Sequence, residues 1–166
     1  MCKKFAEFWD LYNQAFPADE RRDITVQKQV MQNSCYDIEC FYEKDKLKGF
    51  CATWTFPEFI FVDHIAVSPE FRGQGIGSEI INKVINDHKK PVILEVERPK
   101  TETAQRRITF YERLGFKLNE FDYYQPSLGQ GKSSIPLHLM SHPNFIKSKH
   151  YEQIKVSIYQ TVYQFV

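Results

Sequence analysis

The sequence has little that would suit a metal centre, a membrane span or a nucleic-acid surface. It contains four cysteines and five histidines among 166 residues, and no two cysteines form C-x-x-C, so no metal site is expected. No apolar run approaches the roughly 18 residues of a membrane span. The 22 basic and 21 acidic residues give a net charge of +1, without the basic excess of a dedicated nucleic-acid binder. The start, MCKKFAEFWD, is too charged for a signal peptide, so we expect a cytoplasmic protein with free thiols.

What is present indicates an ordinary globular domain. Hydrophobic residues make up 42% of the chain and aromatic residues 15%, which argues against disorder. The length fits one domain over residues 1–166. The 3.6-residue spacing of apolar side chains predicts helices, and runs of aromatic and β-branched residues predict strands. The helices are expected over 5–15, 23–32, 75–88, 103–114 and 146–165, and the strands over 36–43, 47–56, 59–67, 92–96, 116–118 and 137–140.

The most informative segment is the turn RGQGIGS, which follows a predicted strand and opens a predicted helix. Glycines allow positive φ and close backbone approach, and the unpaired amides of a helix N-terminus attract anions. The turn therefore suits a pyrophosphate, and a plain tight turn is the alternative. The spacing G-x-G-x-G after an antiparallel meander does not fit a dinucleotide fingerprint. A second segment, GQGKSS, fails as a nucleotide phosphate loop because Pro126 stands where the first glycine belongs.

Three motifs together resemble the GNAT superfamily of acetyl-CoA-dependent N-acetyltransferases. They are IAVSPEFRGQGIGSEII at residues 65–81, VILEV at 92–96 and FYERLGF at 110–116. The resemblance implies a GNAT-like α/β fold, with a mixed and mostly antiparallel central sheet flanked by helices, to which this chain adds a C-terminal helix. It also implies that acetyl-CoA is the co-substrate. The expected CoA-binding residues are Ile65, Ala66 and Val67 for the pantetheine arm, Arg72, Gly73, Gln74, Gly75, Ile76, Gly77 and Ser78 for the pyrophosphate, and Arg107 for a phosphate.

Acyl transfer to an amine needs a base for the ammonium, a donor for the oxyanion and a proton for the leaving thiolate. Tyr111 lies in FYERLGF where many family members carry a general-acid tyrosine, although it could equally be a core aromatic residue. Asp63 is the leading candidate base, because a carboxylate in an apolar strand is costly unless it is paired or functional. Strand alternation would place Asp63 on one face with Ile65 and would turn His64 to the other, and burial would raise the pKa of Asp63.

Glu95 and Glu97 form a second acidic pair, at the end of the strand beside the one that carries Asp63. Either could bind a cationic acceptor or act as the base through a water, and a solvated strand end is the alternative. The loops PADERRD and DYYQPS could line the acceptor pocket, and ordinary loops are the alternative.

The sequence thus predicts an N-acetyltransferase that acts on a primary amine of a small molecule or peptide. A non-catalytic acyl-CoA-binding sensor or assembly module is the alternative, because both would keep the glycine turn. The apolar residues of the tail helix lie on two stripes, which predicts burial against the sheet or in a homodimer.

Overall fold

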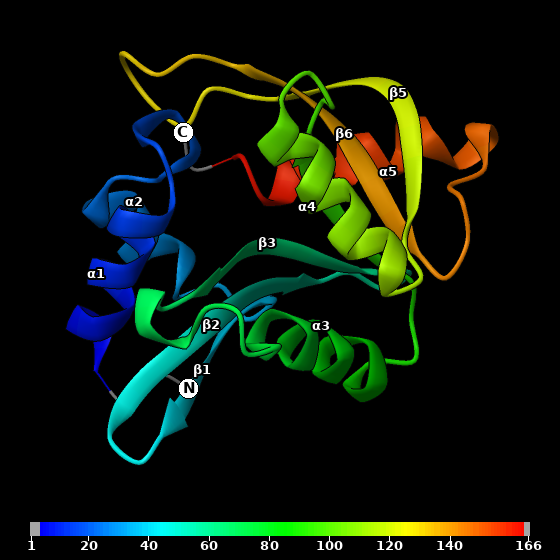
Figure 1. Ribbon diagram of the computed structural model, residues 1–166. Helices are drawn as coiled ribbons and strands as arrows, with labels where there is room; N and C mark the ends of the chain where they lie inside the picture. Colours follow the sequence, from blue (N-terminus) through cyan, green and yellow to red (C-terminus); the bar gives the residue numbers. More distant parts are fainter. Residues whose placement is uncertain (1–3, 165–166) are drawn as a thin grey trace.

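A six-stranded sheet forms the centre of the molecule in the computed structural model, which describes residues 4–164 (Figure 1). The strands lie in the order β1-β2-β3-β4-β6-β5, and only the β3–β4 pair is parallel. The predicted mixed and mostly antiparallel sheet is therefore confirmed. The strands are β1 (Tyr36–Glu43), β2 (Lys46–Thr55), β3 (Ile60–Val67), β4 (Val92–Glu97), β5 (Lys117–Gln125) and β6 (Ile135–His142).

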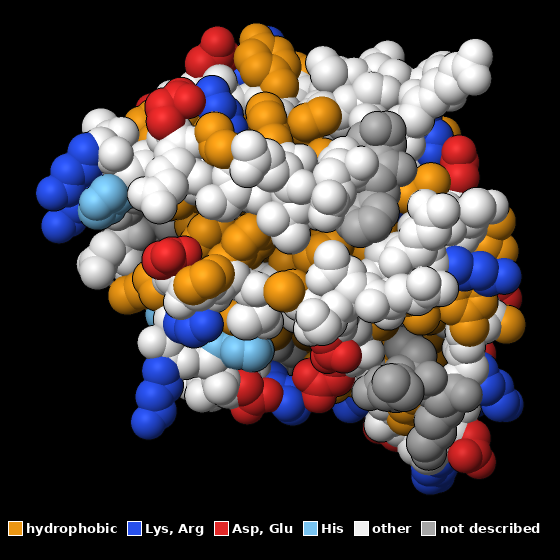
Figure 2. Space-filling view, turned by 180° about the vertical axis from the view of Figure 1, so that it is seen from behind, with side chains coloured by type: hydrophobic (Ala, Val, Ile, Leu, Met, Phe, Trp, Pro, Cys, Tyr) orange, Lys and Arg blue, Asp and Glu red, His pale blue; other side chains and the backbone are white. Residues whose placement is uncertain are grey.

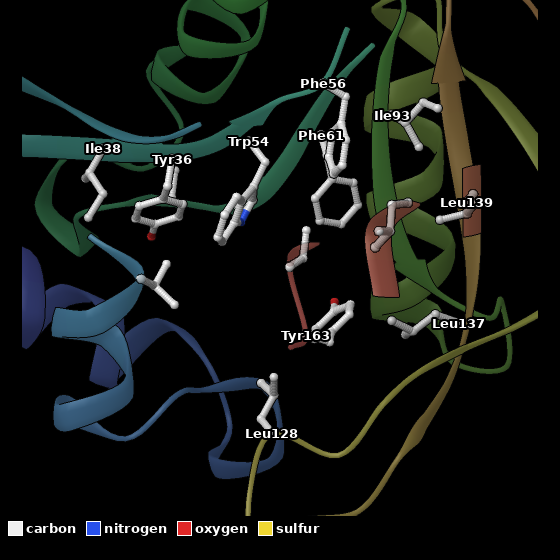
Figure 3. Close-up of a cluster of buried hydrophobic side chains, with 14 of the residues drawn as sticks. Tyr36, Ile38, Trp54, Phe56, Phe61, Ile93, Leu128, Leu137, Leu139 and Tyr163 are labelled. Carbon is white, nitrogen blue, oxygen red and sulfur yellow. The ribbon is translucent and has the colours of Figure 1, made fainter. Parts of the chain in front are cut away.

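Helices cover both faces of this sheet. Two short 3-10 turns, η1 (Ala18–Glu20) and η2 (Pro69–Phe71), accompany the helices α1 (Phe5–Ala15), α2 (Ile24–Val30), α3 (Ile76–Asp87), α4 (Glu102–Arg113) and α5 (Ser148–Thr161). One buried cluster joins α1, α2 and α5 to the sheet, and a second joins α3 and α4 to the other face. Figure 3 shows part of the first cluster, in which Trp54 and Phe61 face Leu137 and Leu139 across the core.

Strand β3 carries a bulge that changes which side chains share a face. Ala52 pairs with His64 and Thr53 with Val62, so Asp63 is the extra residue between them. The alternation reverses there, because a bulge places one additional residue on one strand. His64 consequently faces α1, against Tyr12 and Phe16, while Ile65 packs with the opposite cluster. The expectation that Asp63 shares its face with Ile65 and not with His64 is wrong for this reason.

The same strand separates from β4 soon after they meet. The parallel ladder pairs Ile60–Val62 with Val92–Leu94 and then stops. In β4, Glu95–Glu97 continue to pair with β6 on the other side. Within the described part of the chain, the edge of β3 that faces β4 is thus left without a strand partner after Val62.

Helix α5 packs mainly within the chain. Tyr151 and Ile158 are buried on its inward side, whereas Val156 is exposed. Hydrophobic side chains gather at the centre of the surface seen in Figure 2. An apolar pocket of about 360 Å³ lies between α5 and the sheet, with Phe59, Ile93 and Ile154 in its walls. A homodimer stays a prediction, which light scattering of the purified protein would test.

Two further sequence expectations can be compared with the structure. Cys35 and Cys51 have free thiols, whereas Cys40 is disulfide-bonded, which corrects the expectation for that cysteine. None of the helices in residues 4–164 has the length and apolar character to cross a membrane.

Candidate active site

A groove runs between β3 and α4 and brings most of the predicted site residues together. Two cavities of about 510 and 480 Å³ share the walls Ile65, Ala66, Val67, Arg72, Arg107 and Tyr111, so they form one continuous groove. The larger cavity ends at the glycine turn, where Gly73, Gly75, Ile76, Gly77 and Ser78 line it. The other reaches Asp63 and Glu95. Gln74 is set apart, since its side-chain amide donates to the carbonyl of Glu70 at 3.3 Å.

The glycine turn has the backbone geometry that an anion site requires. Gly73 and Gly75 have φ values of 76° and 79°, which L side chains rarely adopt. Gly75 caps α3 and supplies no side chain to the first amides of the helix, which remain available to an anion. Gly77 has another role, because a Cβ there would lie 3.3 Å from the ring of Phe110 on α4. The turn therefore offers free amides and also lets α3 approach α4.

Tyr111 lines both cavities from the inward side of α4. Its ring is buried against Phe110 and Phe116, as the core interpretation expects, and the functional interpretation stays a prediction. Its hydroxyl makes no hydrogen bond to another residue in 4–164, and it is free to meet a ligand in the groove. Burial raises the pKa of the Tyr111 hydroxyl, so it keeps its proton at neutral pH.

Asp63 is a buried partner of Arg22. The Arg22 guanidinium lies 2.7 Å from Asp63 Oδ2, and both side chains are almost completely buried. The indole of Trp54 donates to Oδ2 at 3.0 Å, and His64 Nδ1 lies 3.4 Å from Oδ1. Burial alone would raise the pKa of Asp63, but the charge of Arg22 outweighs it and holds the pKa well below its usual range. The expectation of a raised pKa is therefore wrong, and the carboxylate is unsuited to take a proton.

Glu95 has the properties that were expected of Asp63. Its side chain comes from β4, borders the same cavity, and accepts hydrogen bonds from the hydroxyls of Tyr123 at 2.5 Å and Tyr163 at 2.6 Å. Burial raises the pKa of Glu95 to about 7, and the two hydroxyls limit this rise. A carboxyl with such a pKa can exchange a proton near neutral pH.

Glu97 lies farther out, beside a smaller cavity of about 70 Å³ that also borders Glu95. Its carboxylate is 3.9 Å from Arg107, and both side chains are about half exposed. Such an exposed pair contributes little to stability. Glu20 of the loop PADERRD and Gln125 of the loop DYYQPS line this cavity too, and their role as walls of an acceptor pocket stays a prediction. Burial and the nearby charge of Glu97 raise the pKa of Glu20.

The segment GQGKSS leads into a strand and holds a loop in place. Lys132 Nζ is 3.0 Å from Asp23 Oδ1 and also donates to the carbonyl of Arg21. The amide of Ser133 donates to Asp19 Oδ1 at 3.2 Å. No helix follows, because β6 begins at Ile135, so the segment lacks the geometry of a nucleotide phosphate loop.

Three residues of the site were not found by sequence reasoning. Arg22 stands in a charged loop where nothing in the pattern marks one charge as buried. Tyr123 was noticed only as part of a loop patch, and Tyr163 only as part of an apolar stripe. The contacts of all three join segments far apart in the chain, which local patterns do not record. No group of three His, Cys, Asp or Glu side chains in residues 4–164 is arranged to hold a metal ion.

Comparison with known proteins identifies the family. Residues 35–118, just over half of the chain, match the acetyltransferase (GNAT) domain. YjbC of Bacillus subtilis, provisionally assigned as an acetyltransferase, is 33% identical over 114 residues, which are 66% of this chain and 56% of that protein. A structure from Bacteroides thetaiotaomicron, provisionally assigned to the GNAT acetyltransferases, is 35% identical with a TM-score of 0.89, over 96% of this chain and 91% of that one.

A GNAT acetyltransferase from Elizabethkingia anophelis with acetyl-CoA bound shares the fold. It is 16% identical with a TM-score of 0.58, over 80% of this chain and 88% of that one. The matched domain spans the meander, the glycine turn and α4, which are the elements that form the groove. The chain belongs to the GNAT acetyltransferase family.

Proposed function

We propose that this protein transfers an acetyl group from acetyl-CoA to a primary amine. The observation that carries the proposal is the placement of Glu95 and Tyr111 on one cavity that continues into the glycine turn. The groove thus joins an anion site to a proton acceptor and a proton-bearing hydroxyl. The Elizabethkingia anophelis relative with acetyl-CoA bound supports acetyl-CoA as the co-substrate.

The cofactor would extend along the groove from the turn to β3. The backbone amides of residues 72–78 would hold the pyrophosphate, with Arg72 and Arg107 at its edges. The unpaired edge at Ile65, Ala66 and Val67 would bond to the amide groups of the pantetheine arm, as an added strand would. In this arrangement the thioester would lie near Tyr111, which lines the same cavity as these three residues.

In the proposed reaction, Glu95 takes a proton from the acceptor ammonium, directly or through a water. The neutral amine then attacks the thioester carbonyl, forming a C–N bond. The amide of Val67 stabilises the oxyanion of the tetrahedral intermediate. When the C–S bond breaks, the electron pair stays on sulfur, and Tyr111 donates a hydrogen bond to the thiolate. The raised pKa of Tyr111 keeps that donor protonated. As the amide forms, its nitrogen releases its second proton to water, and the thiolate takes up one proton from water in exchange.

The acceptor end of the groove favours a cation. Glu20, Glu95 and Glu97 border the same small cavity and come from two separate segments of the chain. A protonated amine would be attracted to this acidic end before it loses its proton to the base. We therefore propose a cationic primary amine, carried by a small molecule or by a peptide, as the acceptor.

The test is a calorimetric titration of acetyl-CoA into the protein, with ATP and NAD as controls, followed by mass spectrometry of an amine panel. The panel would contain a polyamine, an aminoglycoside, lysine and a short peptide with a free N-terminus. Acetyl-CoA binding and a product heavier by one acetyl group are expected. Binding without any product would instead support the non-catalytic acyl-CoA-binding module, and the absence of acetyl-CoA binding would contradict both functions.

A further inference from the structure

Glu95 is held by two tyrosines that come from opposite ends of the C-terminal third of the chain. Tyr123 on β5 donates to Oε2 at 2.5 Å, and Tyr163, which follows α5, donates to Oε1 at 2.6 Å. Each carboxylate oxygen therefore has one tyrosine partner, and the carboxyl plane is fixed from both sides. A carboxylate has about four acceptor positions, so two remain for a substrate or water in the cavity.

The position of Tyr163 depends on the packing of α5. Ile158 and Val162 are completely buried, and they anchor the end of the helix beneath the sheet. Figure 3 shows Tyr163 in the core between Phe61 on β3 and Leu137 on β6. The tyrosine therefore lies at the place where β3 and β4 separate, which is where the cavity opens.

The hydroxyls of Tyr123 and Tyr163 are the main groups that stabilise the ionised form of Glu95, because no positive charge is paired with it in the described residues. Glu95 forms no ion pair with any residue in 4–164, and the nearby guanidinium of Arg22 is already paired with Asp63. The other titratable or charged groups that face this region are Asp63 and His64 on β3, Glu20 on η1, Glu97 on β4, Arg107 on α4 and Tyr159 on α5. Asp63 favours the protonated form of Glu95 and His64 opposes it, so the hydroxyls of Tyr123 and Tyr163 are the largest influences that favour the ionised form.

We infer that α5 is part of the catalytic apparatus, with Tyr163 and Tyr123 as positioning residues that orient Glu95 towards the acceptor. The inference rests on the proposed function, in which Glu95 is the base. Neither tyrosine needs to touch the substrate, since each acts through the carboxylate. Their hydroxyls stabilise the ionised form, which is the form that can accept a proton.

Removing one hydroxyl should therefore shift the pKa of Glu95 in a known direction. Tyr163→Phe deletes a hydrogen bond to the ionised carboxylate and leaves the ring in the core. The pKa of Glu95 should rise by roughly one unit, because a hydrogen bond to a charged group is worth about that much. Tyr123→Phe should act in the same direction and provides a second variant on a different element.

The experiment measures the carboxyl directly. Protein carrying ¹³C at the glutamate side-chain carboxyls is titrated from pH 5 to 9 and followed by NMR, and the Glu95 signal is identified by its loss in Glu95→Gln. The matched control is Tyr151→Phe, which removes a buried hydroxyl of α5 that donates to the carbonyl of Asp122 at 3.4 Å, away from Glu95. The same variants are then assayed for acetyl transfer to an amine from the panel across the same pH range.

The two readouts separate the inference from the proposed function. An upward pKa shift in Tyr163→Phe and in Tyr123→Phe, matched by the acid limb of the rate profile and absent from Tyr151→Phe, is the expected result. An unchanged Glu95 pKa in both variants would overturn the positioning role, whatever the activity. A shifted pKa with an unshifted acid limb would mean that the tyrosines hold Glu95 but that Glu95 is not the base, which overturns the catalytic part of the inference.

Discussion

Asp63 and Glu95 face one cavity from neighbouring strands, yet their surroundings suit them to different tasks. Asp63 has a buried guanidinium at 2.7 Å and stays ionised. Glu95 has only two hydroxyls as partners, and burial brings its pKa to about 7. Two carboxyl groups whose environments give them different pKa values can have different roles in one site. We propose that Asp63 serves as a structural anion and Glu95 as the proton acceptor.

The raised pKa of Glu95 predicts a pH-dependent stability. Between its ordinary value of 4.5 and about 7, the folded protein binds this proton more strongly than the unfolded chain does. The free energy of unfolding of the wild type, relative to Glu95→Gln, should therefore fall as the pH rises through that window, by at most about 3 kcal/mol. Urea unfolding at pH 5 and pH 8 measures the difference. A relative stability independent of pH would contradict the raised pKa.

Tyr111→Phe should separate binding from turnover. The ring keeps its packing against Phe110 and Phe116, while the hydroxyl that we propose as the donor to the leaving sulfur is lost. We expect kcat to fall roughly 10²-fold with unchanged acetyl-CoA affinity in calorimetry. Tyr124→Phe, at an exposed tyrosine outside the groove, is the control and should retain its activity. Full activity in Tyr111→Phe would remove the hydroxyl from the mechanism.

The turn into α3 is the element that we propose to hold the cofactor phosphates. Its φ of 79° at Gly75 leaves the helix amides open, and nothing lies within 4 Å of where a Cβ would be. A side chain added at Gly75 displaces no protein neighbour. It would therefore lower stability through the backbone conformation alone, and lower acetyl-CoA affinity by filling space that the ligand needs. The effect on stability and the effect on acetyl-CoA affinity can therefore be measured separately.

Gly75→Ala should cost about 1 kcal/mol of stability and also weaken acetyl-CoA binding. Gly131→Ala is the matched control, since Gly131 has a φ of 78° and equally empty surroundings in a loop away from the groove. Both variants should lose similar stability in urea, and only Gly75→Ala should lose affinity in calorimetry. Equal affinities in the two variants would mean that the turn does not hold the cofactor.

Elements were more predictable from the sequence than their contacts. Apolar spacing gave the first helix and the first strand their observed bounds, because one buried face requires that spacing. The positive φ of 92° at Gly115 follows from its place after α4. The bulge at Asp63 was not predictable, since an extra residue leaves no mark in a strand that is apolar on both faces. The raised pKa expected for Asp63 was wrong, because the pKa of each carboxyl depends on Arg22, Tyr123 and Tyr163, which only the tertiary structure brings close.

At the scale of the whole molecule, Arg22 connects three parts of the fold. Its guanidinium pairs with Asp63 on β3, its backbone amide donates to the Tyr12 hydroxyl on α1 at 2.7 Å, and Nη2 lies 3.5 Å from the carbonyl of Val162 after α5. The pair therefore ties the loop before α2 and the end of the chain to the strand at the site. Tyr163, whose hydroxyl donates to Glu95, directly follows Val162 in the chain.

Arg22→Met and Asp63→Asn should each destabilise the protein by about 3–5 kcal/mol, because each leaves a buried charge or dipole without its partner. The double variant should lose less than the sum, and urea unfolding of all four proteins measures the coupling. The stability that comes from Asp63 is present above its ordinary pKa of 3.8 and should be lost as the pH falls below that value. Additive losses would show that the pair is not coupled.

The pH profile of kcat/KM for acetyl transfer, measured in the wild type and in Glu95→Gln, tests whether Glu95 is the base. If Glu95 is the base, the wild-type profile rises with an apparent pKa of about 7, and Glu95→Gln loses roughly 10²-fold in rate together with that limb. If Glu95→Gln keeps the wild-type rate and the same limb, another group takes the proton, and the account of this site is wrong.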